Sequence, residues 1–126
     1  MEGIRPKLLV VEDDTIMGME MKEILESFGY DVIDVCDQAE KAVISAQRAG
    51  PDAVLMDIRL KGDTDGIEAA ERMRVFSAVP IVFLTGYKDN ATVERAAKIM
   101  NSLYLTKPVD FDDLRLKLSG FLSKKV

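Results

Sequence analysis

The chain has 126 residues, of which 48% are hydrophobic and 31% charged, and its 17 basic and 22 acidic residues give a formal net charge of −5. This length and composition predict one globular domain over residues 1–126, and the negative balance without a basic block disfavours direct nucleic-acid binding. No apolar run approaches the roughly 18 residues of a membrane span and the N-terminus lacks a secretory pattern, so we expect no membrane partner and a cytoplasmic location.

Short apolar runs alternate with amphipathic stretches along the whole chain. The first run, Lys7–Val11, predicts a buried strand, and residues 14–28 place apolar side chains at helical spacing. Residues 31–36 alternate as a half-buried strand does, and residues 39–49 predict a second helix. Cys36 is the single cysteine and lies in an apolar run, so we expect a buried small residue rather than a reactive thiol.

The second half of the chain repeats this alternation. It predicts strands at 53–56, 80–84 and 102–105, helices at 66–76 and 90–100, and a last helix that begins after Asp110. Asp89 or Asn90 is the expected N-cap of the fourth helix, and Asp110 that of the last. Apolar strands separated by helices predict an α/β fold, in which helices cover both faces of a parallel sheet.

In such open sheets, ligands bind at the carboxyl ends of the strands. The residues at those ends are Glu12 and Asp13 after the first strand, Asp57 after the third, Thr85 after the fourth and Lys107 after the fifth. The chain contains no histidine, which excludes Ser-His-Asp and Cys-His catalysis and, with one cysteine, the usual zinc sites. Chemistry here must depend on carboxylates, a hydroxyl, an amine and a hard metal ion.

Clustered carboxylates are costly to ionise unless a cation neutralises them, and Mg²⁺ is the natural cation for oxygen ligands. A phosphate oxygen could occupy a free position on that ion, while Lys107 and Thr85 meet two further oxygens. Asp57, at the centre of the sheet, would be the nucleophile that accepts a phosphoryl group. Taken singly, an acid such as Asp13 or Asp14 is more often a helix cap, and Thr85 or Lys107 is more often ordinary turn chemistry.

Five motifs carry a resemblance to a known family: "LLVVEDD" at 8–14, "AVLMDIRL" at 53–60, "DGIEAAERMR" at 65–74, "PIVFLTG" at 80–86 and "YLTKP" at 104–108. Together they resemble the receiver domain of two-component response regulators, which includes chemotaxis regulators. The resemblance implies a single receiver domain over 1–126 with the flavodoxin-like fold, a (βα)5 doubly wound sheet of five parallel strands in the order 2-1-3-4-5.

The resemblance also implies a role for each site residue. Asp57 would be the phosphoacceptor, Asp13 a direct Mg²⁺ ligand, Glu12 an acid that acts on the metal through water, and the Arg59 carbonyl a further ligand. Thr85 and Lys107 would hold the phosphoryl oxygens, and the Lys107-Pro108 peptide bond would be cis.

The family's switching behaviour involves the fifth strand. Thr85 would couple phosphorylation to Tyr104 and to the face formed by the fourth helix, fifth strand and fifth helix. From periodicity alone, Tyr104 is a half-buried strand aromatic. Arg59 and Tyr87 stand at positions that tune the lifetime of the phosphorylated state in the family.

The resemblance implies partners as well. The phosphoryl donor would be a phosphohistidine on a histidine kinase or a phosphotransfer domain, and the target a downstream output domain or protein. A homodimer formed through the face of the fourth and fifth helices is also plausible.

This sequence departs from the family in the loop after Asp57. Lys61 replaces the proline that often follows the phosphoacceptor by four residues, and Gly66 comes nine rather than eight residues after it. The loop is thus one residue longer than usual, and its geometry is not given by the resemblance.

Three functions compete. The first is a phosphorylation-activated signalling switch that is not an enzyme on external substrates, and the second is a phosphorylation-independent, receiver-like interaction module. The third is a phosphatase with an aspartyl nucleophile, but that class usually has a second acid two residues further on, where this chain has Arg59.

Overall fold

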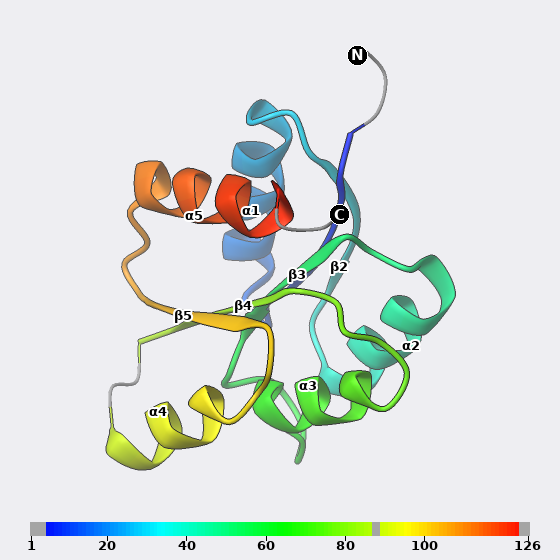
Figure 1. Cartoon of the computed structure of the whole chain (residues 1–126), viewed down its shortest axis with the longest axis vertical. Coiled ribbons are helices and arrows are strands. Elements are labelled where there is room, and N and C mark those ends of the chain that lie inside the picture. The colour runs from blue at the N-terminus through cyan, green and yellow to red at the C-terminus, as the bar shows by residue number, and fades with distance from the viewer. Residues whose placement is uncertain (1–4, 87–88, 124–126) are drawn as a thin grey trace.

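The computed structural model describes residues 5–86 and 89–123. Strands and helices alternate along the chain (Figure 1). The strands are β1 (Lys7–Val11), β2 (Asp31–Cys36), β3 (Ala53–Asp57), β4 (Ile81–Thr85) and β5 (Ser102–Thr106). The helices are α1 (Thr15–Ser27), α2 (Ala39–Ala49), α3 (Gly66–Arg74), α4 (Asn90–Ala97) and α5 (Phe111–Ser123).

The five strands form one parallel sheet in the order β2-β1-β3-β4-β5. The α/β flavodoxin-like fold and its strand order are therefore confirmed. Val11 pairs with Met56, Asp57 with Leu84, and Thr85 with Thr106, so the carboxyl ends of β1, β3, β4 and β5 lie at one edge.

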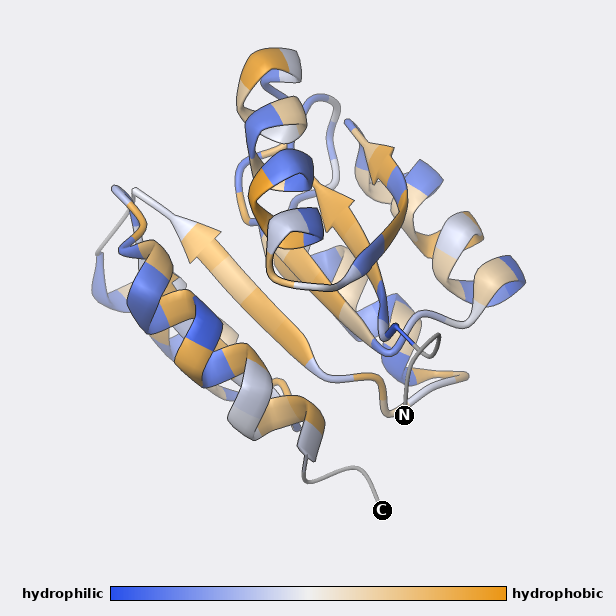
Figure 2. Cartoon of the chain, turned by 90° about the horizontal axis from the view of Figure 1, so that it is seen from above, coloured by the Kyte–Doolittle hydropathy of each residue, from blue (hydrophilic) through white to orange (hydrophobic). Residues whose placement is uncertain are grey.

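Helices cover both faces of the sheet. α1 and α5 lie on one face, and α2, α3 and α4 lie on the other (Figure 1). The strands are mostly hydrophobic, whereas the helices carry polar residues among the apolar ones (Figure 2). Leu25 of α1 and Leu114 and Leu118 of α5 are buried in one core, while Ile67 and Met73 of α3 are buried in the other.

Aspartates cap the N-termini of α1, α3, α4 and α5, whereas the Gln38 side chain makes no cap hydrogen bond at α2. The Asp14 carboxylate accepts the backbone N–H of Ile16 at 3.0 Å, Asp89 accepts that of Thr92 at 3.0 Å, and Asp110 accepts that of Asp112 at 3.0 Å. The predicted caps Asp89 and Asp110 are confirmed, and Asp14 rather than Asp13 caps α1. Asp13 therefore remains available for another role.

Two predicted helix ends are wrong. α3 ends at Arg74 instead of residue 76, and α4 ends at Ala97 instead of residue 100. Apolar spacing continues past both ends, but tertiary contacts stop α4: Asn101 has a left-handed φ of 56°, and the Arg74 guanidinium donates to the carbonyl of Met100 at 2.6 Å.

Two single-residue expectations have different outcomes. Cys36 is buried as predicted, and burial raises the pKa of its thiol to about 11. Met17, by contrast, lies at helical spacing with the apolar face of α1 but is 42% exposed. No helix in the described residues is long and apolar enough to span a membrane.

β2 lies at one side of the sheet and is irregular. Its register with β1 shifts between Leu8 and Leu9. Past this shift, the Asp34 carboxylate accepts the N–H of Val35 at 2.9 Å and the hydroxyl of Ser45 in α2 at 2.6 Å. Asp34 thus joins the strand to the neighbouring helix.

Candidate functional site

Lys107 connects the acids at the carboxyl edge of the sheet. Its Nζ lies 2.9 Å from Glu12 Oε1 and 3.0 Å from Asp57 Oδ2. The backbone N–H of Lys107 also donates to the Thr85 carbonyl at 2.8 Å, which fixes the lysine relative to the end of β4. The Lys107-Pro108 peptide bond is cis, as predicted. Residues at or just after the ends of β1, β3, β4 and β5 therefore meet at one place.

The acids form a compact group. One carboxylate oxygen from each of Glu12, Asp13 and Asp57 lies within 4.8 Å of the other two. Glu12 and Asp57 are buried, whereas Asp13 is half-buried. A cation placed between these oxygens would be reached from one side by solvent and from the other by the buried acids.

Glu12 is in an unfavourable position for a lone carboxylate. Burial, the hydrogen bond to Asp57 and the charge of Asp57 raise the pKa of Glu12 to about 7, although Lys107 opposes this shift. Its Oε2 atom is buried and has no hydrogen-bond partner in the described part of the chain. Because a buried oxygen without a partner is costly, this atom fits a ligand that supplies positive charge, directly or through water.

The environment of Lys107 favours its charged form. Burial alone would lower the pKa of Lys107, but hydrogen bonds to Glu12 and Asp57, together with the negative charges of both, outweigh burial and raise it. The ammonium therefore stays charged at neutral pH and presents a fixed positive charge beside Asp57.

The loop between β3 and α3 returns to the carboxyl edge of the sheet at Asp57. The Arg59 N–H donates to Asp57 Oδ1 at 3.3 Å, and the Gly66 N–H donates to the Ile58 carbonyl at 2.7 Å. A Cβ at Gly66 would collide with the Asp57 carbonyl, so only glycine allows this approach. Within this loop, Gly62 has a left-handed φ of 93°.

Thr85 and Tyr104 lie on the neighbouring strands β4 and β5. Thr85 is completely buried as the last residue of β4. Tyr104 is half-buried on β5 and packs against the core on the α2–α4 side of the sheet. Burial and the negative charge of Asp89 raise the pKa of Tyr104. Tyr87, at the predicted lifetime-tuning position, lies outside the described residues.

An apolar cavity of about 220 Å³ adjoins the site. Its charged lining residues are Glu12, Glu20, Asp57 and Lys107, and Met17, Met21 and Phe111 are among its apolar ones. The exposed position of Met17 is therefore at the rim of the site and not in the core.

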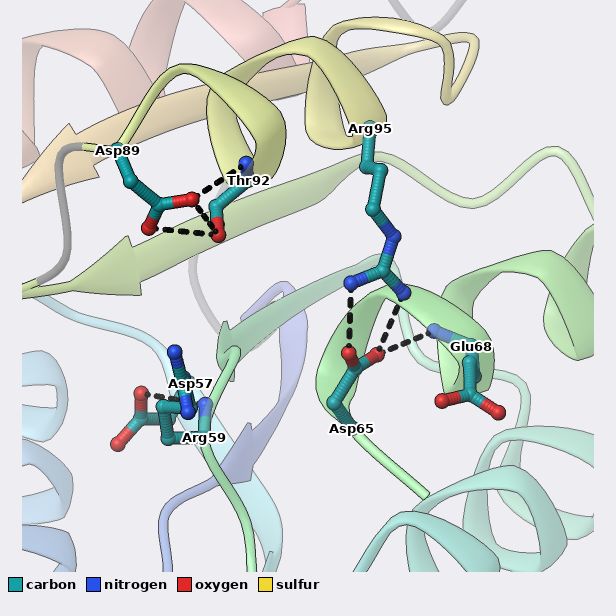
Figure 3. A network of polar contacts seen from close by, with 7 residues as sticks. All are labelled: Asp57, Arg59, Asp65, Glu68, Asp89, Thr92 and Arg95. Atoms are coloured by element: carbon teal, nitrogen blue, oxygen red, sulfur yellow. Dashed lines mark hydrogen bonds and ion pairs between the residues drawn. The ribbon is translucent and has the colours of Figure 1, made fainter. Parts of the chain in front are cut away.

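The sequence did not reveal how α4 is connected to the site. Arg95 of α4 forms an ion pair with Asp65, the N-cap of α3, with 2.9 Å between Nη1 and Oδ2 (Figure 3). These residues are thirty positions apart. No helical or strand periodicity relates them, so only the folded structure could find the pair.

Comparison with known proteins identifies the family. The model of the response regulator receiver domain matches residues 8–119. Transcriptional regulatory protein PdtaR of Mycobacterium tuberculosis is 33% identical over 108 residues, which cover 86% of this chain and 52% of that protein. Aerobic respiration control protein ArcA of Escherichia coli is 32% identical over 119 residues, which cover 94% of this chain and 49% of that protein. The chain thus spans about half the length of these curated relatives.

Solved structures agree with the sequence relatives. The signal receiver domain of a modulated diguanylate cyclase from Desulfovibrio desulfuricans is 38% identical, with a TM-score of 0.88 and 97% of each chain covered. Chemotaxis protein CheY4 of Vibrio cholerae is 21% identical with a TM-score of 0.84, covers 94% of this chain and 99% of its own, and supports the fold alone. The acids and the lysine at the sheet edge thus belong to a chain whose sequence and fold both match one group of signalling domains. This chain belongs to the response regulator receiver domain family.

Proposed function

We propose that this chain is a phosphorylation-activated switch in which Asp57 accepts a phosphoryl group from a phosphohistidine. A carboxylate oxygen of Asp57 forms the new O–P bond, the N–P bond of the donor breaks, and the imidazole nitrogen leaves with that electron pair. The product is an acyl phosphate. The observation that carries the proposal is the position of Lys107, whose ammonium lies 3.0 Å from Asp57 and is fixed there by its second contact to Glu12.

Mg²⁺ is the metal that we propose for the acidic group. Asp13, Asp57 and the Arg59 carbonyl would be direct ligands, and Glu12 would act through a bound water. The unpartnered Oε2 of Glu12 and the compact oxygen cluster support this assignment. The ion would offset negative charge on the transferring group.

The remaining residues would act on the phosphoryl oxygens. Lys107 would bind one oxygen as a point charge, and the Thr85 hydroxyl would donate to another. Because Lys107 already neutralises part of the charge on Glu12 and Asp57, it lowers the cost of bringing a further anion to this edge. Asp57 then reacts in a setting that is positioned before the donor arrives.

Switching would follow from the added negative charge. A phosphoryl group brings about −1.5 to −2 charge to Asp57, and Thr85 would shift toward it. Tyr104 would then turn inward and change the face formed by α4, β5 and α5. The half-buried position of Tyr104 on β5, packed against the core, supports this role.

Partners of the domain follow from the same proposal. The donor would be a histidine kinase or a phosphotransfer domain, and the response would pass to an output domain or protein or to a homodimer formed through the α4–α5 face. We also propose that the chain is a single receiver domain over 1–126 and acts in the cytoplasm.

One experiment tests the proposal. The chain is incubated with Mg²⁺ and acetyl phosphate, and its intact mass is measured beside that of Asp57→Asn. We expect a mass increase of one phosphoryl group that requires both Mg²⁺ and Asp57. A modification that survives Asp57→Asn, or no modification at all, contradicts the switch and favours a phosphorylation-independent interaction module. Steady phosphate release from ordinary phosphomonoesters would instead indicate a phosphatase.

A further inference from the structure

α4 is the most lightly packed helix on its face of the sheet. It has eight residues, Asn90–Ala97, and its buried residues are Thr92 and Ala96. α3, which lies beside it, buries Ile67 and Met73 along with smaller residues. Since apolar burial stabilises a helix in proportion to its area, polar contacts matter more for α4 than for α3.

Among the described residues, the carboxylates of Asp89 and Asp65 both contact α4. Asp89 caps its first turn and also accepts the Thr92 hydroxyl at 2.9 Å. One turn further on, both terminal nitrogens of Arg95 reach the carboxylate of Asp65, at 2.9 Å and 3.3 Å (Figure 3). The first contact lies within α4, whereas the second connects α4 to α3.

Asp65 is itself fixed relative to Asp57. Its Oδ1 accepts the N–H of Glu68 as the N-cap of α3. The next residue, Gly66, donates to the Ile58 carbonyl at 2.7 Å and lies directly against the Asp57 carbonyl. The Arg95 contact therefore connects α4 to the end of the loop that begins at the phosphoacceptor.

We propose that the Asp65–Arg95 ion pair restrains α4 in its phosphoryl-free position, so that release of the pair favours the phosphoryl-bound conformation. This inference rests on the proposed function of Asp57. A rearrangement of the α4–β5–α5 face displaces a helix whose apolar packing is slight, and the ion pair opposes that displacement. The side chains of Arg95 and Asp65 are 45% and 24% exposed, so the restraint from this ion pair is modest and sensitive to salt.

The test uses beryllium fluoride with Mg²⁺, which mimics the bound phosphoryl group without turnover. Its dissociation constant is measured by NMR titration for the wild type and for Arg95→Gln. When only a fraction of the protein is in the binding-competent conformation, the apparent affinity falls by that fraction. We expect Arg95→Gln to bind about two- to fourfold more tightly, in keeping with the strength of exposed ion pairs.

Three further variants separate the restraint from a general effect of charge or stability. Lys117→Gln removes the same charge from an ion pair within one helix, Lys117–Asp113, and is expected to leave the affinity unchanged. Asp65→Asn keeps a cap acceptor and is expected to match Arg95→Gln, and the double variant to show no further gain. The gain is also expected to shrink in about 500 mM salt compared with about 50 mM.

Unchanged or weaker binding by Arg95→Gln, or an additive double variant, would overturn the restraint. If the wild type itself fails to bind beryllium fluoride, the proposed function of Asp57 fails instead. The two failures are therefore distinguishable.

Discussion

Glu12 is a buried carboxyl group whose ionisation is unfavourable without a neighbouring cation. Its carboxyl has a pKa of about 7, raised mainly by burial, whereas the ordinary value is 4.5. The folded protein therefore holds this proton more tightly than the unfolded chain does. The stability from this group is fully present below about pH 4.5 and is lost as the pH rises through about 7.

This residue gives a pH-dependent prediction. In metal-free buffer, we expect the free energy of unfolding to fall between about pH 5 and 8 by roughly 1–3 kcal/mol more in the wild type than in Glu12→Gln. Urea unfolding at a series of pH values measures it. We also expect added Mg²⁺ to restore stability at pH 8 in the wild type, because an ion that binds only the native state stabilises it. Equal pH profiles for the two proteins would contradict the raised pKa.

At the scale of elements, the junction between β3 and α3 depends on the absence of a side chain. The sequence predicted a loop that is one residue longer than usual. It did not predict that the loop returns so closely that Gly66 contacts the Asp57 carbonyl. This contact is a property of three-dimensional packing, which a linear motif does not describe.

Gly66→Ala tests that junction. The new methyl group would meet the Asp57 carbonyl and Met56 Cγ, the latter at 2.9 Å, so we expect a loss of about 2–4 kcal/mol in the free energy of unfolding. Gly120→Ala is the matched control, because nothing lies within 4 Å of a Cβ there. In helix α5 that change is expected to be neutral or to stabilise by about 0.5–1 kcal/mol. Similar losses in both variants would exclude the proposed contact.

The sequence predicts the strands and helices better than it predicts where the helices end. Every strand and helix was predicted, because buried parallel strands and amphipathic helices have distinct periods. The ends of α3 and α4 were misplaced, and at α4 the left-handed Asn101 and the Arg74 contact override a continuing apolar pattern. Because the carboxyl ends of parallel strands meet at one edge, the sequence correctly predicted that Glu12, Asp57 and Lys107 lie together. No comparable rule predicts the pairing of Asp65 at the start of α3 with Arg95 of α4.

At the scale of the whole molecule, Cys36 is a probe of global opening. Burial raises its thiol pKa to about 11, and the side chain hydrogen-bonds to Asp34 and Ser45. The raised pKa keeps the reactive thiolate scarce in the native state, although the hydrogen bond to Ser45 by itself acts to lower it. We expect alkylation at pH 8 to be much slower than for a denatured control and to accelerate in urea in step with unfolding. Native-state labelling at the rate of the denatured control would show that the thiol is accessible.

The irregular strand β2 affects how two copies of the domain can associate. The Cys36 carbonyl faces β1, where it accepts the N–H of Glu12, so the neighbouring Val35 directs its backbone groups to the outer flank of the sheet. There the Asp34 carboxylate already occupies the Val35 N–H. A strand from a second molecule would find that donor taken and a negative charge beside it. Two copies of the domain are therefore discouraged from joining their sheets edge to edge through β2.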